Sequence, residues 1–488
     1  MKLKSKVLAL GVAFLMGMST PLALAGIVAK DSTTKIMLNG KDTALKGYEV
    51  NDNNYFKLRD LAKALNISVT YDEKTNTASL DSTKPYVDGA QKLATGNWAK
   101  ETREAMQAVM DKNAGAGKYV VFDFDNTTAI NDVEEALLIY QIENLAFKIK
   151  PDQMYNVLKT QIPDMNKAVG KNDAGKEVTS DMLANDITAD YKVLYNSYSG
   201  FNAGGKATLE QVHKTNAYTD FAAKLRYMYS AVGDTFDASV SYPWVTYLFA
   251  GMTADEVYAL ANASHRYWSD YPEWTEKKWT SPAAQPGKSG VITASYLTGI
   301  RITSELRDLY TKLMASGIDV YVVSASFIDV IRAAARDPFF GLNVPEDHIF
   351  AMQLKKDANG RYLPEYNYDF GAAGKYAQTQ AAGKSTVIKN FIAPKYNGAG
   401  PLMVFGDSAG DYNMMTEFSD TVLGVIFNRY RKTSDPIWKV SVEAANTIGQ
   451  ANPRYVLQGR DNNTGELLPT QKSRMLGKEE LVLVRPAA

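Results

Sequence analysis

The chain has 488 residues, with 54 Lys and Arg against 54 Asp and Glu, three histidines and no cysteine. At roughly 150 residues per domain, this length predicts about three folded units. A formal net charge of zero argues against nucleic acid as a partner, because that binding depends on basic surfaces. The absence of cysteine excludes disulfides, thiolate nucleophiles and cysteine metal sites. Any catalysis is therefore expected to use carboxylates, hydroxyls and amines.

The first 25 residues have the pattern of an export signal. Three lysines precede an apolar run at 7–18, and Ala-Leu-Ala at 23–25 matches a small-residue cleavage site. The run is too short to span a bilayer, and no later stretch is long and apolar enough for a transmembrane helix. We therefore expect an exported protein that is secreted or associated with the cell surface.

Residues 30–81 are expected to form a small α+β module. Leu58, Leu61, Ala62 and Leu65 have the spacing of one apolar helix face, and a hairpin with a turn at 72–76 follows. The letters NYFKLRDL at 54–61 resemble the N-terminal domain of copper amine oxidases, which is common in secreted and wall-associated proteins of Gram-positive bacteria. The resemblance implies such a source and a spacer or adhesion module that contacts the cell wall. Residues 82–117 are expected to be a linker and a lead-in helix.

The first chemical signal opens the large domain expected at 118–488. The apolar run Tyr119–Phe122 predicts a buried parallel strand, and Asp123 and Asp125 follow it. Residues two apart on an extended chain point the same way, so both carboxylates can share one site. Two close carboxylates repel each other unless a divalent cation neutralises them. The same pattern is also typical of a turn that simply ends a strand.

A hydroxyl and a lysine are the next signals. Ser324 follows the strand-like run 318–323, at the strand end where open α/β sheets bind ligands. Lys384 lies in a Gly-Lys-Ser sequence at the start of an expected helix. This sequence is not a nucleotide-binding phosphate loop, because that loop needs glycine at the position of Gln378. Lys389 is a competitor, but helix geometry turns it about 140° away from Lys384.

The fourth signal is Asp407 and Asp411, which follow the apolar run 402–405 and a glycine. The order of the four signals resembles the haloacid dehalogenase superfamily of phosphotransferases. The resemblance covers 118–135 and 300–430. It implies an α/β fold with a Rossmann-like parallel-sheet core and a large inserted, mainly helical cap. Asp125 indicates phosphoryl transfer, because dehalogenases lack the second aspartate of the first motif.

The resemblance also implies a role for each matched residue. Asp123 is the expected nucleophile, forming an aspartyl-phosphate, and Asp125 is the expected general acid and base. Mg²⁺ would be held by Asp123, the backbone carbonyl of Asp125 and Asp407, with Asp411 as a further ligand or an orienting group. The expected contacts of the phosphoryl oxygens are Thr127, Ser324 and Lys384.

Residues 128–297 are expected to form the cap, which selects the substrate in this superfamily. Aromatic faces with an acid can hold a quaternary ammonium group, and the alternative is that the rings fill the cap's own core. The chain also resembles exported phosphorylcholine phosphatases. The resemblance rests on the export signal, the aromatic cap and the letters NDVEEALL at 131–138, SAS at 324–326 and VLQGRD at 456–461. Glu134 and Glu135 are then choline ligands or first-turn acids of a helix. The aromatic residues are Tyr195, Tyr198, Phe201, Tyr242, Trp244, Tyr247, Tyr267, Trp268, Tyr271 and Trp274.

The sequence thus predicts an exported, Mg²⁺-dependent phosphomonoesterase acting on phosphorylcholine or a similar small phosphomonoester. One alternative is a broad-specificity acid phosphatase, and another is a phosphotransferase that passes the group to an alcohol. A third is a surface-binding protein that uses a phosphatase fold to capture phosphorylated ligands. Hydrolysis and transfer share the same site residues, so both remain open.

Overall fold

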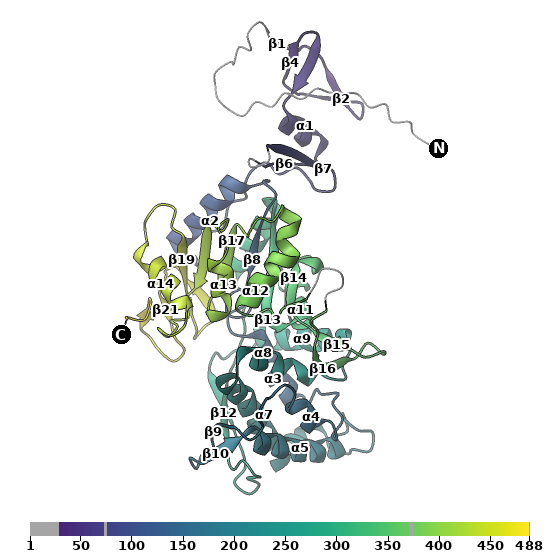
Figure 1. Ribbon diagram of the computed structural model, residues 1–488, viewed down its shortest axis with the longest axis vertical. Coiled ribbons are helices and arrows are strands. Elements are labelled where there is room, and N and C mark those ends of the chain that lie inside the picture. Colours follow the sequence, from purple (N-terminus) through teal and green to yellow (C-terminus); the bar gives the residue numbers. More distant parts are fainter. Residues whose placement is uncertain (1–28, 73–75, 370–374, 488) are drawn as a thin grey trace. The chain divides into compact units, whose positions relative to one another are not determined.

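The computed structural model describes residues 29–72, 76–369 and 375–487 (Figure 1). Two compact units are present. The smaller comprises the chain up to Lys92 with Met110–Lys118 and Lys312–Asp319, and the larger comprises the remaining segments, Leu93–Val109, Tyr119–Thr311 and Val320–Ala488. The expected export signal at 1–25 lies outside the described residues. Within the described ranges, no helix combines the length and the hydropathy that a membrane span requires.

The smaller unit contains an α+β module, as expected. Helix α1 (Leu58–Leu65) buries Ala62 and ends at Asn66, whose φ of 51° stops the helix in a left-handed conformation. The expected hairpin is also present, although residues 73–75 of its turn lie outside the described residues. The likeness to the copper amine oxidase domain stays a prediction. The strands are β1 (Lys30–Asp31), β4 (Gly47–Val50) and β5 (Asn53–Phe56) in one antiparallel sheet, and the hairpins β2 (Ile36–Leu38)–β3 (Lys41–Thr43) and β6 (Ser68–Asp72)–β7 (Thr77–Asp81).

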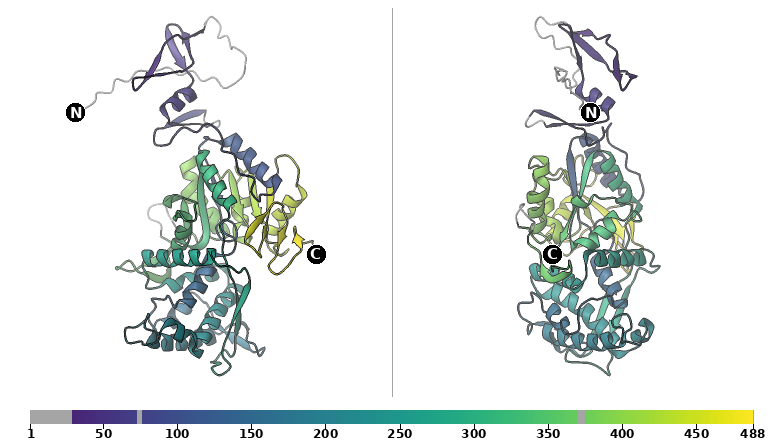
Figure 2. Two further views of the ribbon diagram at one scale, coloured as in Figure 1. Left: turned by 180° about the vertical axis from the view of Figure 1, so that it is seen from behind. Right: turned by 90° about the vertical axis from the view of Figure 1, so that its right-hand side faces the viewer.

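The larger unit is built on a sheet with the strand order β14-β13-β8-β17-β18-β19-β21-β22. The pairs β13–β14, β8–β17, β17–β18 and β18–β19 are parallel. All residues of β17, β18 and β19 are buried, because helices cover both faces of the sheet (Figure 2). The expected Rossmann-like α/β core is thereby confirmed. Its central strands are β8 (Lys118–Phe122), β13 (Ile318–Phe327), β14 (Ile349–Met352), β17 (Met403–Gly406), β18 (Leu423–Phe427) and β19 (Tyr455–Asp461).

Short strands extend the sheet beyond β19, and helices connect the central strands. β20 (Glu466–Leu468) pairs antiparallel with β19, and β21 (Ser473–Arg474) pairs antiparallel with β22 (Leu481–Val482). The hairpin β15 (Leu354–Lys356)–β16 (Tyr362–Tyr366) stands apart from the sheet. The helices of the core are α2 (Lys100–Asn113), α10 (Ser304–Ala315), α11 (Ile328–Arg336), α12 (Ala382–Val387), α13 (Tyr412–Thr416) and α14 (Ile437–Asn446), with the short turns η2 (Glu346–His348), η4 (Ile388–Ile392), η5 (Ala393–Tyr396) and η6 (Ala409–Asp411).

The segment between the first two motifs forms a mainly helical body, as expected for the cap. Its chain leaves and returns at one place, because Ile130 and Arg301 exchange backbone hydrogen bonds of 2.8 and 3.2 Å. Most of its helices are drawn in blue and teal in Figure 1. Its elements are α3 (Val133–Glu143), α4 (Met154–Leu158), β9 (Ala168–Lys171), β10 (Glu177–Thr179), α5 (Ser180–Ser197), α6 (Leu209–His213), α7 (Asn216–Thr235), α8 (Ala238–Trp244), η1 (Val245–Phe249), α9 (Ala254–Ser269), β11 (Glu276–Thr280) and β12 (Thr293–Leu297).

Candidate active site

Three of the predicted carboxylates meet at the ends of two adjacent parallel strands. Asp123 follows β8 and Asp407 follows β17, while Asp411 closes the turn η6. Each offers a carboxylate oxygen, and these oxygens all lie within 4.8 Å of one another. All three side chains are buried. Parallel pairing of β8 with β17 therefore brings together aspartates that are 284 residues apart in the chain, from 123 to 407.

Lys384 neutralises part of this cluster. Its ammonium donates to Asp123 Oδ1 at 2.5 Å and to Asp411 Oδ1 at 2.7 Å. Burial raises the pKa of Asp123 and the charge of Asp411 raises it further, whereas Lys384 lowers it. Lys389, the competitor, is on the exposed side and binds Glu417 at 2.6 Å. Of the two lysines, Lys384 is the one that contacts the carboxylate cluster.

Asp411 is oriented by the backbone of its own motif. Its Oδ2 accepts hydrogen bonds from the backbone N–H groups of Asp407 at 2.9 Å and Ser408 at 3.3 Å. A Cβ at Gly406 would lie 2.5 Å from the Cβ of Asp411, so only glycine permits this approach. With Oδ1 bound by Lys384, both oxygens of Asp411 already have donors. Of the two roles expected for Asp411, this geometry favours the orienting one.

Asp125 is held by hydroxyls and by the start of the cap. Its Oδ1 accepts from the backbone N–H of Val133 at 2.7 Å, and its Oδ2 accepts from Ser326 Oγ at 2.6 Å and more weakly from Ser324 Oγ at 3.4 Å. Burial raises the pKa of Asp125, and the hydrogen bond from Ser326 opposes this rise. A raised pKa suits a carboxyl group that must both give and accept a proton.

The remaining predicted phosphate contacts also reach the site. Thr127 Oγ1 lies 3.3 Å from Asp123 Oδ2 and 3.3 Å from Asp407 Oδ1. Ser324 lies within β13, because this strand continues to Phe327 rather than ending at 323. All seven predicted site residues are thus in one region of the larger unit.

The donor set fits a hard divalent cation. Every ligand atom available in the cluster is an oxygen, which is the preference of Mg²⁺ and Ca²⁺ rather than of softer metals. The four aspartates at 123, 125, 407 and 411 face two cationic side chains, Lys384 and Arg429. The difference is two negative charges, which one divalent cation would balance.

Two arginines to which the sequence analysis gave no role, Arg429, and Arg460 of the VLQGRD segment, complete the site. Arg429 follows β18 by two residues, and its Nη1 donates to Asp407 Oδ2 at 2.8 Å. Arg460 in β19 is 2% exposed, and its Nη1 and Nη2 donate to the backbone oxygen and Oδ1 of Asn126 at 2.9 and 3.0 Å. Asn126 has a φ of 60°, so Arg460 stabilises the strained loop between Asp125 and Thr127. An arginine just after an apolar strand was the available signal for Arg429.

The start of the cap places acids beside Asp125. Asp132 caps helix α3 by accepting from the backbone N–H groups of Glu134 and Glu135, each at 2.9 Å. Glu135 pairs with Arg226 at 2.5 Å. Glu134 is 4% exposed; its Oε2 accepts from the backbone N–H of Phe327 at 2.7 Å, and its Oε1 has no hydrogen-bond partner among the described residues. Burial raises the pKa of Glu134 to about 8.

Three of the aromatic residues named for the cap, Trp244, Tyr247 and Trp268, are buried. Trp244 and Trp268 are buried, and their indole N–H groups donate to the backbone oxygens of Leu158 and Ala136, each at 2.8 Å. Tyr195 stacks on Phe201 with ring centroids 5.6 Å apart. Tyr242 differs, because its ring is partly exposed and its hydroxyl lies 4.0 Å from where a Cβ at Gly410 would stand, next to the Asp411 motif. Of the two interpretations left open for the aromatic rings, packing within the cap holds for the two buried tryptophans.

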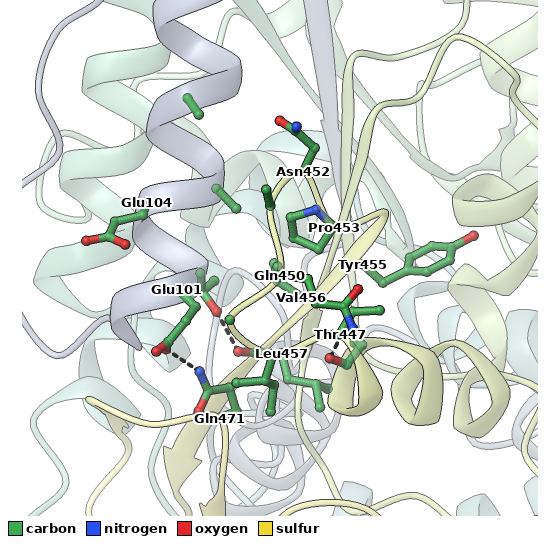
Figure 3. A pocket seen from close by; sticks show the side chains of 17 residues that line it. Glu101, Glu104, Thr447, Gln450, Asn452, Pro453, Tyr455, Val456, Leu457 and Gln471 are labelled. Carbon is green, nitrogen blue, oxygen red and sulfur yellow. Dashed lines mark hydrogen bonds between the residues drawn. The ribbon is translucent and has the colours of Figure 1, made fainter.

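A surface cavity of about 220 Å³ lies away from this site (Figure 3). It is formed by α2, the end of α14 and β19. On one wall, Gln471 Nε2 donates a hydrogen bond to Glu101 Oε2 at 2.5 Å. None of the predicted site residues lines it.

Comparison with known proteins found similar solved structures and a similar curated protein. A conserved protein of unknown function from Anaerococcus prevotii is 31% identical, with a TM-score of 0.70 over 79% of this chain and 98% of that chain. A phosphorylcholine phosphatase from Pseudomonas aeruginosa is 26% identical over 332 residues, covering 64% of this chain and 74% of that protein. A phosphoserine phosphohydrolase-like protein from Francisella tularensis covers 64% of this chain and 87% of its own length, at 14% identity and a TM-score of 0.26, too weak a likeness to support an inference. No family model matches the chain.

Proposed function

We propose that this chain, which belongs to the same family as the Anaerococcus prevotii protein, is an exported, Mg²⁺-dependent phosphatase acting on phosphorylcholine or a similar small phosphomonoester. The reaction would pass through an aspartyl-phosphate on Asp123. Export rests on the pattern of the first 25 residues. Contact with the cell wall through the N-terminal module rests on the resemblance of residues 54–61.

The enzyme class has the firmest basis: the chain is a phosphomonoester hydrolase of the haloacid dehalogenase type. The observation that carries this conclusion is the position of Asp123, which accepts a hydrogen bond from Lys384 and lies beside Asp407 and Asp411. Asp125, two residues on, is turned toward hydroxyls. A nucleophile, a paired general acid and a cation beside an oxygen-donor cluster are the parts that phosphoryl transfer requires.

The residues divide the chemistry in two steps. First, a carboxylate oxygen of Asp123 attacks phosphorus, the ester P–O bond breaks, and the departing alkoxide takes the proton of Asp125. Second, a water molecule gives a proton to Asp125 and attacks the same phosphorus, which releases phosphate and restores the Asp123 carboxylate. The proton that Asp125 lends in the first step returns in the second, so the enzyme is unchanged.

The groups around Asp123 would stabilise the negative charge on the phosphoryl oxygens. Lys384 already contacts the nucleophile and is placed to offset charge on the phosphoryl oxygens, with the hydroxyls of Thr127 and Ser324 as further donors. When bound, a divalent cation held by Asp123, Asp407 and the backbone carbonyl of Asp125 would supply further positive charge to those oxygens. Arg460 holds the loop that carries Asp125 and Thr127.

Choice of substrate rests on the cap start. Glu134 keeps a buried carboxyl oxygen without a partner near Asp125, and a cationic headgroup would favour its ionised form. Glu135, the other candidate choline ligand, is already paired with Arg226. Tyr242 adds an aromatic ring next to the Asp411 motif. Together with the 26% identity to a phosphorylcholine phosphatase, these contacts favour a phosphomonoester with a cationic leaving group.

The test is phosphate release by the protein without residues 1–25. Phosphorylcholine, phosphoserine and p-nitrophenyl phosphate are compared with Mg²⁺ and with a chelator, and Asp123→Asn is the control. We expect Mg²⁺-dependent release that the control abolishes, with kcat/KM highest for phosphorylcholine. Equal activity on all three esters would favour a broad-specificity phosphatase. Release only in the presence of an added alcohol acceptor would identify a transferase, and no release from any ester would leave the binding-protein alternative.

A further inference from the structure

The arginine after β18 extends a series of functional groups along the sheet. The neighbouring strands β13, β8 and β17 each bring a polar group to one edge: Ser324, Asp123 and Asp407. β18 is the next strand in the parallel series, and Arg429 stands in the corresponding position just after its end. Ligands of open parallel sheets bind at this edge. Its place in the fold therefore assigns Arg429 to the site rather than to the surface.

The guanidinium has capacity for another partner. Nη1 binds Asp407, while Nε and Nη2 have no hydrogen-bond partner among the described residues. The side chain is 29% exposed, so the guanidinium beside Asp407 is accessible from outside. Lys384, by contrast, is 2% exposed and is committed to Asp123 and Asp411. A phosphate dianion entering the site would find its planar, bidentate donor in Arg429.

The charge balance points the same way. A divalent cation held by Asp123 and Asp407 would share the neutralisation of Asp407 with Arg429. The substrate's phosphoryl group then brings negative charge that no carboxylate can offset. Arg429, of whose guanidinium only Nη1 is engaged by Asp407, is a cation next to the cluster that is placed to meet this charge.

The loop carrying Arg429 is held in a strained shape by the C-terminal segment Leu481–Arg485. Tyr430 has a φ of 52°, a conformation that is costly for a bulky side chain. Arg485 Nε donates to the backbone oxygen of Tyr430 at 3.0 Å, and its guanidinium lies 4.3 Å from the Tyr430 ring centroid. On the other side of Arg429, the Asn428 amide donates to the backbone oxygen of Leu483 at 2.5 Å. Fixing the backbone on both sides preorganises the arginine between them.

From these contacts we propose that Arg429 is a second cationic contact of the phosphoryl group, positioned by the C-terminal segment through Asn428 and Arg485. This inference rests on the proposed function, because it assumes that a phosphomonoester enters the site. It adds a residue that the four motifs do not contain. Arg429 would contact substrate and product phosphate, whereas Arg485 is a positioning residue.

The test measures binding of inorganic phosphate by calorimetry, in saturating Mg²⁺, without turnover. Arg429→Gln should raise the dissociation constant of phosphate about 10- to 100-fold, the value of a charge-assisted hydrogen bond. Arg429→Lys, which keeps the positive charge but not the planar pair of N–H donors, should give an intermediate dissociation constant. Arg485→Gln should raise it about 2- to 5-fold through lost cation–π contact. The matched control is Arg431→Gln, because Arg431 is two residues away and pairs with Asp435 at 2.7 Å.

Three results would overturn the inference. One is unchanged phosphate affinity in both Arg429 variants. Another is an equal loss in Arg429→Gln and Arg431→Gln, which would mean general surface charge. The third is a native protein that binds no phosphate, which would overturn the proposed function as well. Phosphate binding and ester turnover by the native protein with no effect of Arg429 would refute this inference alone.

Discussion

Replacing Lys384 by methionine should make the folded protein unstable in a pH-dependent way. The ammonium is 2% exposed and joins Asp123 and Asp411, which are themselves buried. Removing one partner of a buried ion pair leaves an uncompensated buried charge and costs about 3–5 kcal/mol of unfolding free energy. Here two carboxylates lose the same partner, so we expect a loss at the upper end of that range at neutral pH without metal.

The sign of the pH dependence follows from Asp123. Its folded-state pKa lies well above its unfolded value, mainly because of burial and then Asp411, and Lys384 opposes this rise. Between the two pKa values the folded state therefore binds more protons than the unfolded state, so stability falls as the pH rises. Lys384→Met widens this interval. The variant should approach the native protein in stability near pH 4 and fall behind it progressively toward neutral pH.

Urea denaturation followed by tryptophan fluorescence measures this effect in the right place, because all six tryptophans lie in the larger unit. Lys389→Met is the matched control, since Lys389 is five residues on, exposed and paired with Glu417 on the surface. Mg²⁺ should restore part of the loss, about 2.7 kcal/mol at 100 times its dissociation constant. If Lys384→Met is as stable as Lys389→Met at neutral pH without metal, the electrostatic reasoning about the cluster is refuted.

Three further predictions concern single side chains of the site. Asp123→Asn should lower kcat by about 10⁴-fold or more while stabilising the metal-free protein, as turnover and urea titrations would show; a stable but active variant would exclude the nucleophile role. Ser326→Ala should raise the pKa of Asp125 further and move the basic limb of the pH–kcat profile upward, with a smaller effect of Ser324→Ala at the longer contact. Burial raises the pKa of Glu134 in the folded protein to about 8, so Glu134→Gln should remove the loss of stability that the native protein shows between about pH 4 and pH 8. The same substitution should raise KM for phosphorylcholine but not for p-nitrophenyl phosphate. Equal changes in both KM values would count against choline recognition.

The central part of the site could be predicted from the sequence because its signals are local. Asp123 and Asp407 each follow an apolar run that can only be a buried strand, and parallel strands bring such ends to one edge. Lys384 could be separated from Lys389 by helix geometry alone. In each case the period of a single element decides where the side chain points.

What the sequence could not provide depends on packing between distant segments. Nothing near Trp244 or Trp268 reveals that their rings fill the cap, because burial is decided by helices that meet only after folding. Arg460 reaches the Asn126 loop across 334 residues, and no local pattern marks a buried arginine without a carboxylate partner. Ser324 and Ser326 both lie in the Ser-Ala-Ser sequence, which does not show which hydroxyl binds Asp125 more closely. The structure gives 2.6 Å for Ser326 and 3.4 Å for Ser324.

The paired segments at Ile130 and Arg301 have an evolutionary meaning. Because the two ends of the inserted body lie side by side and hydrogen-bond to each other, its length makes almost no demand on the sheet it interrupts. Natural selection could enlarge, shrink or replace that body while Asp123, Lys384 and Asp407 stayed in place. The carboxyl end of β8 is thus an insertion point, where a changed cap can bring new substrate preferences while the catalytic residues of the core stay the same.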